Sequence, residues 1–555
     1  MAAQALLLGI LLLLLPPPIP APCHTAKRSE CRRVRRFVPG MGLAGEGVDV
    51  TTLQRSGSFP VDTQGFLRPD GTCTLCSSAL RPGTLWLLPL AFTHWRAHSS
   101  SCQHQVIKTN AISTEAVARE VAKSITNDWK MGLHVSPKTD VNVKVSVAAS
   151  HSEAANFAAG KSHQDRYIFS RDLVKCHFYS FHLVHTPPIH PDFKRALKTL
   201  PPYFNASTEP DYFRLISKYG THFIQAVKLG GQISAITALR TCKLALEGLT
   251  DNQVSDCLAI EAAVSIGDKA DSSAEAKACE EKKRQHKVEG SFHQAYRERY
   301  SEVVGGHHTS IHDLLFGKEA GPEQFSTWVT SLRDSPGLVD YSLEPLHVLL
   351  GGQNPQREAL RWAVSKYLTD RARWKNCSRP CPPGKKKHPH DPCQCVCHGS
   401  AVTTQDCCPR QRGLARLEVR NFQATGLWGD TFTATDAYLK VFFGNQQRRT
   451  STVWNNDNPR WMTQLDFGDV YLATGGGLRV QVWDADHGWD DDLLGTCDRS
   501  PQSGIHEVKC ALPHGQLIFH YHARCLPHLA GNTCLEYAPQ GLLGEPPGNR
   551  SGAVW

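Results

Sequence analysis

The sequence predicts an α+β protein with several domains: a large mixed region, a small cysteine-rich module and a C-terminal β-sandwich. Its 555 residues exceed what one hydrophobic core normally holds. Helical and strand periodicities alternate through residues 24–376. Seven cysteines crowd residues 377–408, and paired aspartates lie at the ends of short strands after residue 413. We therefore expect domains at 22–376, 377–412 and 413–521, with a tail at 522–555 that Cys525 and Cys534 tie down.

A leucine-rich stretch at residues 5–15 opens the chain. It is too short to span a bilayer, and prolines and the small Ala21 follow it. This pattern predicts a secretory signal peptide at 1–21, although its first residues include neither Lys nor Arg. Twenty cysteines after such a signal indicate an oxidising compartment and a disulfide framework. The protein is therefore expected to be secreted.

Glycosylation and charge agree with that expectation. Sequons place candidate N-glycans at Asn205, Asn376 and Asn549. The formal net charge of +9 is spread along the chain in short basic runs. Moderate basicity favours approach to an anionic membrane, while solvated faces account for the runs equally well. No nucleic-acid partner is expected.

The first of two unusual segments lies after Ser113, where a helix is expected to begin. Val117, Val121 and Ile125 recur every four residues. Residues 141–147 then alternate strictly, so that one strand face carries Val141, Val143, Val145 and Val147. The pattern fits an ordinary half-buried strand or an amphipathic membrane strand, and alone it favours the ordinary strand.

The second unusual segment runs from about Leu244 to Arg299. Cys257 and Cys279 bracket apolar-rich and turn-forming stretches within it. Both segments interrupt strands expected in one sheet, around residues 178–185 and 223–229. Long excursions of this kind are uncommon unless they are functional.

The cysteine-rich stretch at 377–408 has almost no apolar core material, so only cross-links can stabilise it. A zinc knuckle is the alternative. The alternating Cys393, Cys395 and Cys397 in a secreted chain favour disulfides, and the stretch resembles an EGF-like module.

Aspartates lie at the ends of both predicted strands of the C-terminal region, at 437–443 and 478–483. Two acids six residues apart precede the first strand, and an Asp-x-Asp with a further Asp six positions on follows the second. Hard cations such as Ca²⁺ prefer six to eight oxygen ligands. An ordinary solvated acidic loop is the alternative. The repeated spacing favours a calcium site.

Residues 413–521 resemble a C2 domain, the calcium-dependent phospholipid-binding module. The resemblance implies side-chain ligands at Asp430, Asp436, Asp484, Asp486 and Asp492, with backbone carbonyls near Gly429 and Asp491 contributing and Asp490 adjoining them. Trp428 and Trp489 border these loops. Each is either a membrane-interface residue or a buried sandwich tryptophan.

The motif Tyr219-Gly220-Thr221-His222-Phe223 resembles the signature of the membrane attack complex/perforin family of pore-forming proteins. The Gly305-Gly306 pair, the Glu344-Pro345-Leu346 turn and the domain order agree with it. The resemblance implies a bent antiparallel central sheet with two helical clusters, as in this family and the cholesterol-dependent cytolysins. It assigns Gly305 and Gly306 to the sheet bend. It also makes His222 a packing residue and not a catalyst.

The resemblance further implies a calcium-dependent cytolytic protein. It would bind the phospholipid membrane of a target cell, form rings with copies of itself, and refold residues 115–165 and 245–300 into membrane-spanning hairpins. The four valines at 141–147 would then face lipid. Since lipid satisfies no backbone hydrogen bond, such strands can enter only as a closed barrel. Storage in cytolytic granules and granule proteases as cargo are implied as well.

An enzyme is not expected. No Gly-x-Ser-x-Gly elbow or His-Glu-x-x-His helix occurs, and Ala155–Ser162 matches a phosphate loop only loosely, with Ala at the first position and no strand leading into it. A secreted calcium-dependent lipid-binding or adhesion protein that makes no pore remains the alternative.

Overall fold

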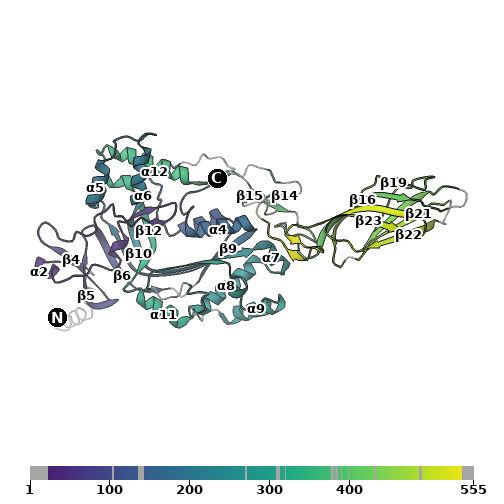
Figure 1. Ribbon diagram of the computed structural model, residues 1–555. Coiled ribbons are helices and arrows are strands. Elements are labelled where there is room, and N and C mark those ends of the chain that lie inside the picture. Colours follow the sequence, from purple (N-terminus) through teal and green to yellow (C-terminus); the bar gives the residue numbers. More distant parts are fainter. Residues whose placement is uncertain are drawn as a thin grey trace, which may run out of the picture.

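The computed structural model describes residues 23–102, 106–135, 143–268, 272–307, 313–318, 320–376, 380–381, 385–388, 391–397, 399–429, 433–474, 476–486 and 491–540. The predicted fold class is confirmed: a mixed region built on an antiparallel sheet leads through a disulfide-linked module into a β-sandwich at the far end of the molecule (Figure 1).

The central sheet contains two long strands, β9 (Tyr167–Leu183) and β10 (His222–Arg240), which pair antiparallel along almost their whole length. Shorter strands extend the sheet on both sides. These are β2 (Gly47–Asp49), β3 (Gln54–Arg55), β6 (Phe92–Cys102), β7 (Ile107–Ala111), β11 (Arg299–Val304) and β12 (Gly337–Pro345). The strands predicted around 178–185 and 223–229 are thus confirmed as neighbours.

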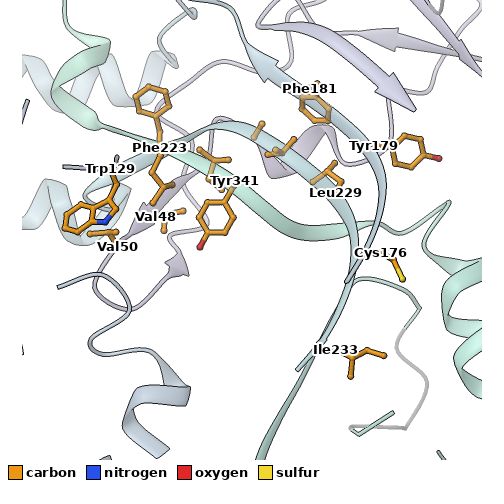
Figure 2. Close-up of a cluster of buried hydrophobic side chains, with 14 of the residues drawn as sticks. Val48, Val50, Trp129, Cys176, Tyr179, Phe181, Phe223, Leu229, Ile233 and Tyr341 are labelled. Carbon is orange, nitrogen blue, oxygen red and sulfur yellow. The ribbon is translucent and has the colours of Figure 1, made fainter. Parts of the chain in front are cut away.

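The sheet bends sharply near Gly230, where the pairing register shifts between Leu229 and Gly230. Figure 2 shows the long strands curving past Leu229 and Tyr179 toward Ile233. A Cβ on Gly230 would lie 1.9 Å from the Cys176 carbonyl oxygen, and one on Gly305 would lie 2.4 Å from the Gly230 oxygen. Gly305 and Gly306 also have positive φ angles of 81° and 83°. Only glycine permits this close backbone approach without strain.

Two helical clusters cover opposite faces of this sheet (Figure 1). On one face lie α3 (Thr114–Ala122) and α4 (Glu153–Gln164), which pack on Phe169 and Ile236. On the other face lie α8 (Asp251–Ser265), α9 (Ser272–Gln285), α10 (Phe292–Ala295) and α11 (Pro322–Ser331), with α7 (Thr241–Leu246) leading into them. The remaining helices are α2 (Arg28–Cys31), α5 (Pro191–Lys198), α6 (Glu209–Tyr219), α12 (Gln356–Arg371) and the 3₁₀ turns Met41–Leu43 and Leu346–Leu349.

Local capping explains where the two clusters begin. The Ser113 hydroxyl accepts a hydrogen bond from the Ala116 amide, so α3 starts where the sequence predicts it. Thr250 and Gln253 form a reciprocal capping box at the start of α8. Within the predicted 141–147 strand, β8 (Val143–Ser146) pairs with β13 (Arg373–Asn376), and Val147 is buried in the core. Val141 lies outside the described residues.

Disulfides join the ends of the large region to its body. Cys23 bonds Cys76, which ties β1 (Cys23–Ala26) to β4 (Cys73–Ser78) beside β5 (Arg81–Leu88), and Cys31 bonds Cys73, which ties α2 to β4. Cys102 bonds Cys176 between two strands of the central sheet. No free cysteine occurs among the described residues. The prediction of a disulfide framework is therefore confirmed.

The small module contains β14 (Lys385–His388) and β15 (Asp391–Cys397), closed by the Cys381–Cys395 and Cys397–Cys407 disulfides. Cys408 instead bonds Cys242 of α7, which fastens this module to the large region. Cys377 and the side chain of Cys393 lie outside the described part of the chain.

The sandwich packs two antiparallel sheets around a core that includes Phe422, Leu439 and Phe519. One sheet holds β16 (Leu414–Thr425), β19 (Arg460–Trp461), β20 (Leu465–Tyr471), β23 (Gly504–Ala511) and β24 (Gln516–Cys525). The other holds β17 (Ala437–Phe443), β18 (Gln446–Arg449), β21 (Leu478–Asp484) and β22 (Asp492–Arg499). Cys497 bonds Cys510 across the sheets, and Cys525 bonds Cys534 beside the short paired strands β25 (Leu529–Ala530) and β26 (Glu536–Tyr537).

The close backbone approach at Gly230 allows a prediction for the variant Gly230→Ala. The added methyl would collide with the Cys176 carbonyl, so we expect a loss of about 1–3 kcal/mol of unfolding free energy, measured by thermal unfolding. Gly160→Ala in α4 is the matched control, because a Cβ added at Gly160 would have no neighbouring atom within 4 Å. Equal melting temperatures for the two variants would contradict the close approach.

Candidate calcium and membrane-binding site

Three predicted acidic residues meet at one end of the β17–β21–β22 sheet. Asp436 directly precedes β17, Asp484 ends β21 and Asp492 begins β22. Asp484 is opposite Ala437 on one side and opposite Asp492 on the other. Antiparallel pairing therefore brings together residues that are up to 56 positions apart, from 436 to 492, in the sequence.

Asp484 is the buried member of this group, with 2% of its surface exposed. One carboxylate oxygen accepts a 2.7 Å hydrogen bond from the Asp436 amide. A Cβ on Gly429 would lie only 1.7 Å from the other oxygen, so the first loop passes directly over this carboxylate. The backbone thus holds this carboxylate between the two predicted loops.

Hydrogen bonds hold the neighbouring acids in place. The Asp436 carboxylate accepts a 2.6 Å bond from the Asn455 amide. The Asp491 carboxylate accepts bonds from the Tyr438 hydroxyl at 2.6 Å and from the Asp486 amide at 3.3 Å. The Tyr438 hydroxyl holds the pKa of Asp491 below its usual range. Burial, together with Asp491, raises the pKa of Tyr438 to about 12.

The donor chemistry fits Ca²⁺, because every candidate ligand is an oxygen. The side chains of Asp436, Asp484, Asp486 and Asp492 are the described residues that would hold it. Among the described residues no three His, Cys, Asp or Glu side chains are arranged closely enough to hold a metal. Asp430 and Asp490 of the predicted set lie outside the described residues. The Asp491 side chain is bonded to Tyr438, which leaves its backbone carbonyl as the predicted contribution.

Exposed tryptophans flank these acids. Trp428 is 54% exposed and packs edge-on against His514, with ring centroids 5.0 Å apart. Trp489 lies outside the described residues. Trp454, which is 65% exposed, was not predicted from the sequence, yet it directly precedes the Asn455 that bonds Asp436. Its neighbours Asn455, Asn456, Asp457 and Pro459 form a turn-like run, and that run is the signal that could have located it.

The motif at 219–223 forms part of the scaffold. His222 is fully buried, with Nε2 2.9 Å from the Trp129 carbonyl oxygen and Nδ1 2.8 Å from the Thr221 hydroxyl. Burial lowers the pKa of His222 to about 4, so the imidazole is neutral. Gly220 has a φ of 78°, and a Cβ there would collide with the Val48 backbone. Tyr219 and Phe223 are buried in the core on either side.

The predicted sequons differ in surroundings. The Asn205 side chain accepts hydrogen bonds from the amides of Ser207 and Thr208 at 3.0 and 3.2 Å. Asn376 ends β13, and Asn549 lies outside the described residues. In the described part of the chain, the helices are all too short or too polar to cross a bilayer.

Comparisons with known proteins agree with this architecture. Residues 38–375 match the MAC/Perforin domain, residues 376–410 match the Perforin-1-like EGF domain, and residues 415–509 match the C2 domain. The chain belongs to the MAC/Perforin family.

Similar proteins cover the chain to different extents. Perforin-1 of Homo sapiens is 74% identical over 555 residues and Perforin-1 of Mus musculus is 65% identical, each covering 100% of both chains. Complement component C6 of Bos taurus is 29% identical over 216 residues, which are 37% of this chain and 22% of that protein. The crystal structure of GNIP1Aa from Chromobacterium piscinae has 14% identity and a TM-score of 0.43, with 86% of this chain and 82% of the other covered.

If Asp484 is a calcium ligand, the variant Asp484→Asn should bind calcium more weakly. Removing its charge should weaken calcium binding by the full-length protein at least about tenfold, measured by isothermal titration calorimetry. Asp466→Asn is the control, since that surface aspartate pairs with Arg416 within the same domain. Equal calcium affinities for wild type and Asp484→Asn would contradict the site.

Proposed function

We propose that this protein is a secreted cytolytic pore former. It docks on the phospholipid membrane of a target cell through its C2 domain in response to Ca²⁺, assembles into a ring with copies of itself, and inserts two β-hairpins per subunit. Calcium, when bound, neutralises the acidic cluster and lets the adjoining loops approach lipid phosphates. Storage in cytolytic granules and delivery of granule proteases belong to the same proposal.

The observation that carries the proposal is the common level at which four paired strands end. Phe169 of β9 pairs with Ala111, the last residue of β7, and with Ala238 of β10. Arg299, the first residue of β11, pairs with Thr237 of β10. The strands therefore end within three residues of one another in the order β7–β9–β10–β11, at the end of the sheet from which both helical segments leave.

Each helical segment connects two strands that already pair with each other. Residues 112–166 join β7 to β9, and residues 241–298 join β10 to β11. If either segment extended, its two arms would continue an existing antiparallel ladder as a hairpin. Two membrane-crossing strands need roughly 20 residues, and both segments exceed that length. Since one subunit would leave two open sheet edges in lipid, closure requires a ring of copies.

The first segment packs mainly through small residues, whereas the second also buries Val254, Leu258 and Phe292 in the main core. The first segment packs small residues, Ala154 and Ala158, on the sheet. Lys161 of this segment and Arg240 of β10 both pair with Glu298 at the end of the second segment, at 2.7 and 2.8 Å. Ion pairs that are partly exposed contribute only about 0–1 kcal/mol each. The ion pairs at Glu298 would therefore oppose release of the segments only weakly.

If the sandwich docks on membranes, we expect Trp454 to contact lipid beside Trp428. Trp454→Ala should reduce calcium-dependent binding to anionic liposomes severalfold, because an exposed indole next to the acidic cluster would enter the lipid interface. Liposome co-sedimentation measures this. Trp362→Ala is the matched control, since Trp362 is 50% exposed on α12, far from these loops in the fold. Identical losses in the two variants would contradict a docking role.

Insertion is tested by clamping α8 to the sheet. The side chains of Asn110 in β7 and Asn252 in α8 form a 3.0 Å hydrogen bond, so we place an engineered cysteine pair at these two positions and verify the disulfide by loss of free thiol. The oxidised double variant should bind liposomes with calcium but release at least about tenfold less dye than wild type.

The serine pair Asn110→Ser with Asn252→Ser controls for loss of the hydrogen bond and should release dye normally. Dye release by the clamped protein at the wild-type rate would refute insertion. It would favour the alternative, a calcium-dependent lipid-binding protein that makes no pore.

A further inference from the structure

A layer of polar side chains separates α8 from the central sheet. Residues directly opposite one another on paired strands share a face of the sheet. Two neighbouring rows beneath α8 are Lys108, Asp172, Ala235 and Ser301, and Asn110, Ser170, Thr237 and Arg299. The Lys108 side chain pairs with Asp256 and the Asn110 side chain with Asn252, both of α8, which assigns both rows to the α8 side. Seven of these eight residues are polar, an unusual composition for a helix–sheet contact.

Several polar groups in this layer are buried without hydrogen-bond partners among the described residues. They are both carboxylate oxygens of Asp172, the hydroxyls of Ser170, Thr237 and Ser255, and Nε of Arg299. Ser255 belongs to α8 itself and is fully buried. An unpartnered buried polar group costs about 1–3 kcal/mol, and a buried charge costs more. Undocking α8 would return these groups to water.

Burial of the Asp172 carboxylate costs more free energy than burial of any other group in the layer. The nearby cations contact other groups instead. Lys108, opposite Asp172 in the ladder, forms an ion pair with Asp256 on α8. The Arg299 guanidinium stacks on Phe316 at 4.2 Å and lies 3.9 Å from Asp313. His293 pairs with Glu261, but both residues belong to the second segment, so that pair does not join α8 to the sheet.

We propose that Asp172 is a proton-controlled latch for α8, which is docked when the carboxyl group is protonated and released when it ionises. This inference rests on the proposed release of α8 during pore formation. In the docked state the neutral acid is tolerated between sheet and helix. Loss of the proton leaves a buried carboxylate without a partner, and water reaches that carboxylate only when α8 leaves.

The direction of the pH effect follows from burial. Burial raises the pKa of Asp172 to about 7, against the opposing attraction of Arg299 and Lys108. An exposed aspartate has a pKa of about 3.9. The contribution of the protonated group to docking is therefore complete below about pH 4 and is lost as pH rises through about 7. The protein would be latched in a mildly acidic store and released at neutral pH.

Hydrogen exchange of the full-length protein tests the latch without calcium or membrane. Protection factors of α8 amides, corrected for intrinsic exchange, should fall at least about tenfold between pH 5 and pH 7.5 in wild type. Asp172→Asn should abolish this fall. Ser170→Ala, which removes a neighbouring unpartnered group that does not titrate, should retain it. Amides of α12 serve as the reference for global opening.

A flat wild-type profile, an equal fall in α12, or a fall retained in Asp172→Asn would each overturn the latch. The wild-type profile and the α12 reference decide the question even if Asp172→Asn does not fold. Dye release from calcium-treated liposomes is measured separately. Loss of α8 protection in a protein that never releases dye would refute the proposed pore while leaving the latch intact.

Discussion

Backbone hydrogen bonding in lipid is the constraint on which the rest of this structure depends. A strand can enter a bilayer only if all its amides and carbonyls are paired, and water supplies those bonds to an open edge only outside the membrane. The long β9–β10 ladder provides a template whose pairing is already complete up to Tyr167 and Arg240. The helices beyond that level satisfy their own backbone groups while the protein is soluble. In the proposed mechanism, calcium at the far sandwich would act as a trigger without taking part in the barrel.

The proposed release from the sheet would also explain why the two helical clusters differ from an ordinary core. The first packs small alanines on the sheet, and the second meets the sheet through a polar layer around Asp172 as well as through the apolar Val254 and Leu258. Close packing of large apolar groups would make release expensive, because burying each such side chain stabilises by roughly 1.5–3 kcal/mol. In contrast, the bend at Gly230 and the motif around His222 are tightly packed and neutral. The closest backbone contacts therefore lie where the strands must hold their register.

Much of the fold was predictable because its signals are local. The caps at Ser113, the alternation that gives β17 and β21, and the crowded cysteines each act within a few residues. Disulfide pairings such as Cys242 with Cys408 were not predictable, since they depend on where the chain returns in space. For the same reason, the sequence located the acids at 436, 484 and 492 but did not identify Trp454 or the buried Asp172, whose roles arise from neighbours on other strands and loops.

Conversion of helix to strand is the central claim, and the periodicity of lipid exposure tests it most directly. An environment-sensitive fluorophore is placed on single cysteines introduced one at a time at positions 153–160 of α4. In the soluble protein, the emission should vary with the helical period of about 3.6 residues, and in calcium-treated liposomes with a period of two. A helical period that persists in the membrane-bound protein would contradict the account.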